Sequence, residues 1–112
     1  MGMFDNVTIS KEAIPVPERL RKTGYQTKEL DCDDSQYEVD PEGRFLKVMW
    51  TRDRGEERFF ACNLSCDVGC YDGIDSFYLR VRNGRVWTTE PEMAEVIPYI
   101  PDLVEWELAT RT

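Results

Sequence analysis

Alternation of apolar and polar positions is the strongest pattern along the chain, and it predicts strands on both sides of two turns. The first turn is Asp40–Gly43, in which proline sets φ at the second position and glycine supplies a left-handed residue. It interrupts an alternating run over residues 36–51. The second turn, Asn83-Gly84, divides a similar run over residues 77–89, and both of its residues tolerate positive φ. The pattern therefore predicts two antiparallel hairpins.

The remaining pattern predicts further short strands and one helix. Strands are expected over residues 3–9, 25–28, 58–63 and 103–108, and a single helical turn over 18–22. A short helix is expected near residues 90–97, because Pro91 suits a first helical turn and Pro98 would end it. The predicted fold is one domain over residues 1–112. It is mainly β, or β-rich α+β: a single antiparallel sheet of about five or six strands with that one helix.

Composition places the chain among ordinary globular domains. Hydrophobic residues make up 41% and charged residues 32% of the sequence. No apolar run approaches the ~18 residues that a membrane-spanning helix needs. Asp5 and Asn6 interrupt the opening, so we expect no signal peptide, no membrane contact and a cytoplasmic location.

The absence of histidine removes several kinds of chemistry. Ser-His-Asp and Cys-His nucleophilic systems, histidine-ligated zinc and imidazole acid–base catalysis all need this residue, and the sequence has none. The sequence contains no phosphate-binding glycine motif and no recognisable activated nucleophile. We therefore expect a protein that is not an enzyme and that uses no cofactor.

The four cysteines allow two interpretations. Four thiolates could close a tetrahedral zinc site, and the candidates are Cys32, Cys62, Cys66 and Cys70. The even three-residue gaps between the last three differ from those of zinc knuckles, and the polar and glycine residues between them favour a loop. Cysteine is also among the residues most often buried. We expect reduced thiols without metal, and a small zinc protein with four cysteine ligands is the alternative.

Charge is the most informative functional signal. The chain carries 14 basic and 22 acidic residues, a net charge of −8, which disfavours direct contact with nucleic acid. Residues 29–42 and 90–107 form acidic blocks without a basic residue in either. These blocks are either solvated surface that pairs with the basic residues in the middle of the chain, or a face that steers the protein towards a basic partner. The candidate partner-binding residues are Glu29, Asp31, Asp33, Asp34, Tyr37 and Glu38, with exposed Tyr37 or Tyr25 as apolar anchors.

Two blocks of the sequence resemble a set of small bacteriophage- and prophage-encoded proteins. The first is the opening Met1-Gly2-Met3-Phe4-Asp5, and the second is the Tyr25-Gln26-Thr27-Lys28-Glu29-Leu30-Asp31-Cys32 stretch. As in that set, an aspartate/glycine turn follows, here residues 40–43. The resemblance covers about the first half of the chain. It implies a phage accessory protein that works in bacterial cytoplasm, and it implies no activity.

Charge and resemblance together predict a non-catalytic phage accessory protein. It would bind a host protein or complex with a basic surface, in the manner of a host-takeover factor or an anti-defence (anti-CRISPR-like) inhibitor; this comparison is an analogy of size and charge. A virion or assembly component is an alternative, and it would need a self-complementary surface. The sequence leaves the oligomeric state and the identity of the partner open.

Overall fold

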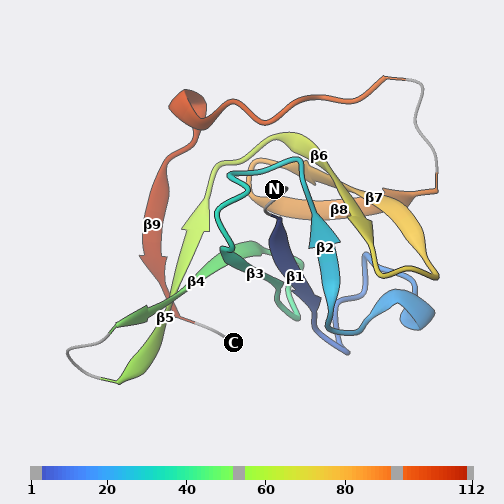
Figure 1. Ribbon diagram of the computed structural model, residues 1–112. Coiled ribbons are helices and arrows are strands. Elements are labelled where there is room, and N and C mark those ends of the chain that lie inside the picture. The colour runs from blue at the N-terminus through green and yellow to red at the C-terminus, as the bar shows by residue number, and fades with distance from the viewer. Residues whose placement is uncertain (1–3, 52–54, 92–94, 111–112) are drawn as a thin grey trace.

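The computed structural model describes residues 4–51, 55–91 and 95–110, except for the side chains of residues 50 and 51. It forms one nine-stranded sheet in the order β8-β7-β6-β2-β1-β3-β4-β5-β9, which curls into a half-barrel (Figure 1). Two 3₁₀ turns, η1 (Glu18–Leu20) and η2 (Pro101–Leu103), lie outside the sheet. The strands are β1 (Asp5–Ile9), β2 (Tyr25–Thr27), β3 (Gln36–Val39), β4 (Phe45–Thr51), β5 (Glu56–Cys62), β6 (Cys66–Tyr71), β7 (Ser76–Arg82), β8 (Arg85–Glu90) and β9 (Trp106–Ala109).

Both predicted hairpins are confirmed. β3 and β4 pair antiparallel across the Asp40–Gly43 turn, where the Gly43 N–H donates to the Asp40 carbonyl at 2.9 Å. β7 and β8 pair across Asn83 and Gly84, whose φ values are 50° and 78°. Positive φ at both central residues gives the turn the twist that neighbouring strands require. The mainly β class and the single helical turn after Pro17 are also as predicted.

The strand count and the purely antiparallel arrangement were predicted wrongly. The sheet has nine strands rather than five or six, and β1 pairs with β3 in parallel, with Val7 opposite Tyr37. The stretch predicted as a cysteine-containing loop is strand β6. Its Gly69 suggested a loop, but a Cβ there would lie 3.0 Å from Glu29 Oε1 and 3.2 Å from the Tyr78 ring. Glycine therefore marks a close approach within the sheet.

The helix predicted near residues 90–97 is also wrong where the structure describes it. Glu90 is the last residue of β8 and pairs with Tyr78, while residues 95–100 contain no helix. Residues 92–94 of the prediction lie outside the described residues. Pairing with β7 keeps the chain in strand conformation up to Glu90, immediately before Pro91. This tertiary pairing overrides the local preference for a helix.

The half-barrel is partly closed where the two predicted turns meet. An isolated bridge joins Arg44 to Arg85. The Phe45 N–H donates to the Gly84 carbonyl, and the Val86 N–H donates to the Gly43 carbonyl, each at 2.8 Å. These bonds cover the start of β8, which would otherwise be a free edge of the sheet.

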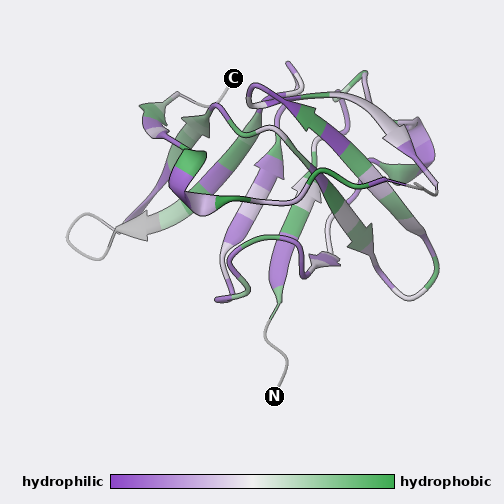
Figure 2. Ribbon diagram, turned by 90° about the horizontal axis from the view of Figure 1, so that it is seen from above, coloured by the Kyte–Doolittle hydropathy of each residue, from purple (hydrophilic) through white to green (hydrophobic). Residues whose placement is uncertain are grey.

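The core fills the inner side of the curled sheet. Hydrophobic and hydrophilic residues alternate along the strands (Figure 2), as expected where one face is buried. Aromatic pairs join the two halves of the core to the central strands: Tyr25 meets Phe77 edge-on at 5.0 Å between ring centroids, and Tyr37 stacks on Phe45 at 5.3 Å. The largest fully buried side chains are Tyr25, Tyr37, Phe45, Ile9, Leu20, Leu46, Leu64 and Leu79.

An ion-pair cluster attaches the turn between β6 and β7 to the segment after η1. Lys22 Nζ lies 2.8 Å from Asp72 Oδ2 and 3.3 Å from Asp75 Oδ2. The Asp72 carboxylate also accepts the N–H groups of Ile74 and Asp75, at 3.0 and 2.8 Å. The hydrogen bond from Lys22, followed by these backbone bonds, lowers the pKa of Asp72 from 3.8 to about 2.

This lowered pKa predicts a specific loss of stability in acid. Because the folded-state pKa of Asp72 lies below its ordinary value, its stabilising contribution is present above about pH 4 and is lost as the pH falls towards 2. Asp72→Asn should therefore flatten the decline of the unfolding free energy in this window, measured by urea titration at a series of pH values. The control is Asp102→Asn, an exposed position in η2. Equal slopes for the parent and Asp72→Asn would contradict the prediction.

Candidate functional site

A buried carboxylate organises the acidic loop, which we define as residues 29–35. Asp5 lies on the core-facing side of β1 and is 0% exposed. Its carboxylate accepts three backbone N–H groups of the loop: those of Cys32 at 2.8 Å, Asp33 at 3.1 Å and Ser35 at 2.9 Å. Hydrogen bonds to a charged acceptor are stronger than neutral ones, so this one side chain fixes the path of the loop.

The acidic loop contains two strained residues. Cys32 and Asp34 have φ values of 55° and 64°, in the left-handed region that side-chain-bearing residues seldom adopt. Ser35 Oγ donates a hydrogen bond to Asp33 Oδ1, which lowers the pKa of Asp33, and Asn6 Nδ2 donates to Asp34 Oδ1 at 3.3 Å. Such strain persists where surrounding contacts determine the conformation, and it is common at functional sites. The loop thus presents the exposed Asp33 and Asp34 in a fixed geometry.

Asp31 connects the acidic loop to two distant segments. Its carboxylate accepts the hydroxyl groups of Tyr37, at 3.0 Å, and Tyr99, at 3.1 Å. Lys47 Nζ lies 3.6 Å from Asp31 Oδ2, and 5.9 and 5.6 Å from the ring centroids of Tyr37 and Trp106. Burial, with the neighbouring Asp31, raises the pKa of both tyrosines. Asp31 is therefore a structural link as well as a surface charge.

A C-terminal arm, residues 95–104, lies beside the acidic loop. The Asp67 N–H donates to the Ile97 carbonyl at 2.9 Å, and the Ile97 N–H donates to Asp67 Oδ2 at 2.8 Å. Arg82 Nη1 holds the other Asp67 oxygen at 2.9 Å. β2 pairs with β6 at Tyr71. Farther along β6, at Asp67, the arm forms the hydrogen bonds instead, and Figure 1 shows the arm running higher in the view than β6. The Tyr99–Asp31 bond then ties the arm to the loop.

The arm carries apolar side chains that face solvent. Val96 is 38% exposed, Ile97 45%, Ile100 48% and Leu103 69%. The last three line, with Leu64 and Pro98 among others, an open depression of about 310 Å³. The acidic loop and the arm thus form one surface in which fixed carboxylates adjoin exposed apolar groups. Buried apolar area next to a charged rim is the usual composition of a protein-binding surface.

The predicted partner-binding residues divide into two groups. The exposed ones are Glu29, Asp31, Asp33 and Asp34, whereas Tyr37 is 2% and Glu38 7% exposed. Tyr25, the other expected anchor, is 0% exposed, so the expectation of exposed tyrosine anchors is wrong. Their strands lie in the middle of the sheet, and the tyrosine rings belong to the core.

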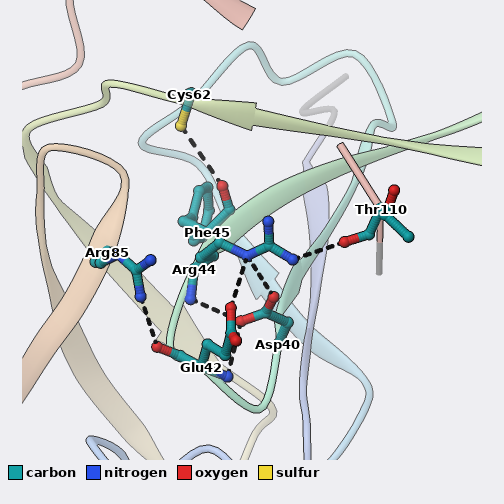
Figure 3. Close-up of polar contacts among 7 residues, drawn as sticks. All are labelled: Asp40, Glu42, Arg44, Phe45, Cys62, Arg85 and Thr110. Carbon is teal, nitrogen blue, oxygen red and sulfur yellow. Dashed lines mark hydrogen bonds and ion pairs between the residues drawn. The ribbon is translucent and has the colours of Figure 1, made fainter. Parts of the chain in front are cut away.

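Basic residues from the middle of the chain supply counter-charges to part of the acidic block, residues 29–42. Lys47 serves Asp31, and Arg44 serves Asp40 at the end of the block (Figure 3). Asp40 is 0% exposed and accepts the N–H groups of Glu42 and Arg44, at 3.0 and 2.8 Å, and Arg44 Nε at 2.7 Å. Within residues 29–42, the exposed carboxylates are therefore those of the acidic loop and Glu42.

The four cysteines lie in separate environments as free thiols. Burial raises the pKa of the Cys66 thiol to about 12 and raises that of Cys70, and both lie on β6. Cys62 Sγ donates to the Phe45 carbonyl at 3.5 Å, and Cys32 Sγ to the Lys28 carbonyl at 3.2 Å. Within the described ranges, no group of three or more cysteine, aspartate or glutamate side chains is placed to hold a metal ion. The cysteines act here as packing residues.

Sequence reasoning missed Asp5 and the arm. Asp5 alternates with Val7 and Ile9, which places its carboxylate on the buried face of the strand, so its role was readable from the predicted strand. The arm gave no such signal, because its position depends on Asp67, a residue predicted to lie in a loop. Exposed apolar residues in an extended segment are also indistinguishable from core residues in the sequence.

A comparison of the chain with protein-family models, curated proteins and solved structures finds no match. In the part of the chain that the structure describes, no helix combines the length and the apolar character needed to cross a membrane.

Proposed function

We propose that the protein is a non-catalytic accessory protein that binds a host protein or complex with a basic surface. The binding surface is the acidic loop together with the C-terminal arm. One observation carries the proposal: three backbone bonds to buried Asp5 hold an exposed acidic loop in a strained conformation. A loop that is already ordered loses less conformational entropy when it binds.

The net charge of the protein would favour the first encounter with a partner, and the exposed apolar side chains of the arm would stabilise the complex that follows. A net charge of −8 produces a long-range field that speeds encounter with a basic partner. The exposed arm side chains, Ile100 and Leu103 among them, offer area that a partner can bury after the encounter. Fixed carboxylates beside this area would set the orientation of the partner.

The residues that carry the phage resemblance build this surface. Asp5 holds the loop, Leu30 is a buried residue within it, and Asp31 links it to the arm. Thr27 Oγ1 accepts the Glu29 N–H at 3.3 Å at its start. This role of the shared residues supports a phage accessory protein as the proposed identity and a bacterial cytoplasmic protein as the proposed partner.

Charge reversal in the acidic loop tests the proposal. The partner is captured from a bacterial lysate at low and high salt and then purified. Asp33→Lys combined with Asp34→Lys should lower its association rate at least about tenfold at low ionic strength, because steering is lost, and should change the dissociation rate less. The dependence of the association rate on salt should also become shallower.

The matched control reverses the same amount of charge elsewhere. Glu12 and Glu18 are exposed and lie outside the acidic loop, so Glu12→Lys combined with Glu18→Lys alters net charge equally. If this control slows association as much as the loop variant does, net charge alone governs the encounter and the loop is not the binding site.

A further inference from the structure

Strand β9 leaves one edge of the sheet open. It pairs with β5 on one side, with Trp106 opposite Cys62 and Ala109 opposite Phe59, and no strand of the described residues pairs with its other side. Figure 1 shows β9 along the outer margin of the molecule. The opposite edge differs, because the bridge to Arg44 covers the start of β8.

An open edge presents unpaired backbone N–H and C=O groups to which another strand can add. Proline, lysine and bulges commonly block such pairing, and β9 contains none of them; of the other blocking features it has a short length of four residues and one charged residue, Glu107. Leu108 is 62% exposed and is aligned with Phe60 across the strand pair. The edge therefore has the backbone and the apolar side chain that strand addition uses.

Two surface depressions flank β9 and define the charge of a fitting partner. The first, about 680 Å³, is lined by Asn63, Asn83, Glu105 and Glu107 among others. The second, about 610 Å³, includes Glu56, Glu57, Arg58, Phe59 and Leu108. The Arg58 guanidinium in the second set lies 3.9 Å from the Glu56 carboxylate. Two further cations lie near β9, Arg44 at the Thr110 carbonyl and Lys47 over the Trp106 ring, and they are paired with Asp40 and Asp31. The exposed Glu105 and Glu107 therefore leave the edge negative. Basic side chains on a strand added to β9 would therefore meet a negative surface.

We propose that the β9 edge binds an extended segment of a partner protein in which basic and apolar side chains alternate. Pairing with a second copy of the chain is disfavoured, because it would bring Glu105 and Glu107 of one copy close to those of the other. This site is separate from the acidic loop, so the two proposals can fail independently.

The experiment uses the full chain and an acetylated nine-residue peptide of alternating lysine and valine. Amide hydrogen exchange measured by NMR should slow at least about tenfold within residues 106–109 when the peptide is added. The same peptide with N-methyl groups on alternate residues keeps its charge but loses backbone donors, and it should give no protection. An alternating glutamate and valine peptide should not bind.

Variants separate this edge from the acidic loop. Glu105→Lys combined with Glu107→Lys should weaken peptide binding at least about tenfold, whereas Asp33→Lys combined with Asp34→Lys should weaken it less than about threefold. Glu12→Lys combined with Glu18→Lys is the control of equal charge. Equal binding of the N-methylated peptide, protection at residues 29–35 instead of 106–109, or dimers of the free chain held together through β9 would each overturn the proposal.

Discussion

Gly84→Ala is expected to lower the free energy of unfolding by more than about 3 kcal/mol, which is a large part of the stability of a typical domain. A Cβ at this position would lie 1.9 Å from the Cys62 carbonyl oxygen and 2.9 Å from its carbon. Both are backbone atoms, so β5 would have to move. The Gly84 N–H also donates to the Leu64 carbonyl at 2.8 Å, and φ is +78°. The substitution therefore affects the turn, the closure of the half-barrel and β5 together.

Gly73→Ala is the matched control. Gly73 has a φ of +92°, but a Cβ there has no atom within 4 Å. Gly73→Ala should lower the free energy of unfolding only by the cost of placing an alanine in the left-handed region, about 1–2 kcal/mol. Urea unfolding of both variants measures the difference, which reports the close approach of Gly84 to β5. Equal losses would show that Gly84 does not approach β5 as described.

Asp5→Asn is expected to destabilise the protein by about 2–4 kcal/mol, because a hydrogen bond to a charged acceptor contributes about 1.5–3 kcal/mol and a buried donor left without an acceptor costs about 1–3 kcal/mol. Asparagine has nearly the same shape, but its amide would set N–H groups against the loop N–H groups that the carboxylate now accepts. The loop should lose its strained conformation. Urea unfolding gives the stability, and NMR chemical shifts of residues 32–35 report the loop.

Asp34→Asn is the control for Asp5→Asn. It removes an exposed carboxylate from the same loop, and asparagine tolerates the φ of 64° found there. It should change stability by less than about 0.5 kcal/mol. If Asp5→Asn has an equally small effect, the loop does not depend on the buried carboxylate. Asp5→Asn should also weaken partner binding, although Asp5 is not exposed.

The sequence predicted well those parts of the fold that depend on neighbouring residues. Each hairpin was readable because its turn contains residues suited to positive φ between alternating runs, as at Asn83 and Gly84. The parallel pairing of β1 with β3 and the addition of β9 to β5 join residues far apart in the chain. No local pattern encodes which strands become neighbours, so the order of the strands was not predictable.

For the site, composition identified the acidic loop but not which of its residues reach the surface. Asp33 and Asp34 are exposed as predicted, because they lie in a loop at the end of the sheet. Tyr37 and Glu38 are successive residues of β3, so their side chains point to opposite faces of the sheet, and yet both are buried. Burial on both faces removes the simple alternation from which exposure is normally inferred.

The central position of β2, β1 and β3 has a consequence for synthesis on the ribosome. These three neighbouring strands all end by Val39, so the middle of the sheet is made before either flank. Later strands can then add outwards in two directions, and contacts within short stretches form faster than distant ones. The bridge between Arg44 and Arg85 joins the two flanks of the sheet, and it closes a loop made of the long stretch of chain between these residues. We expect folding to begin while the chain is still growing and this closure to be one of its late steps.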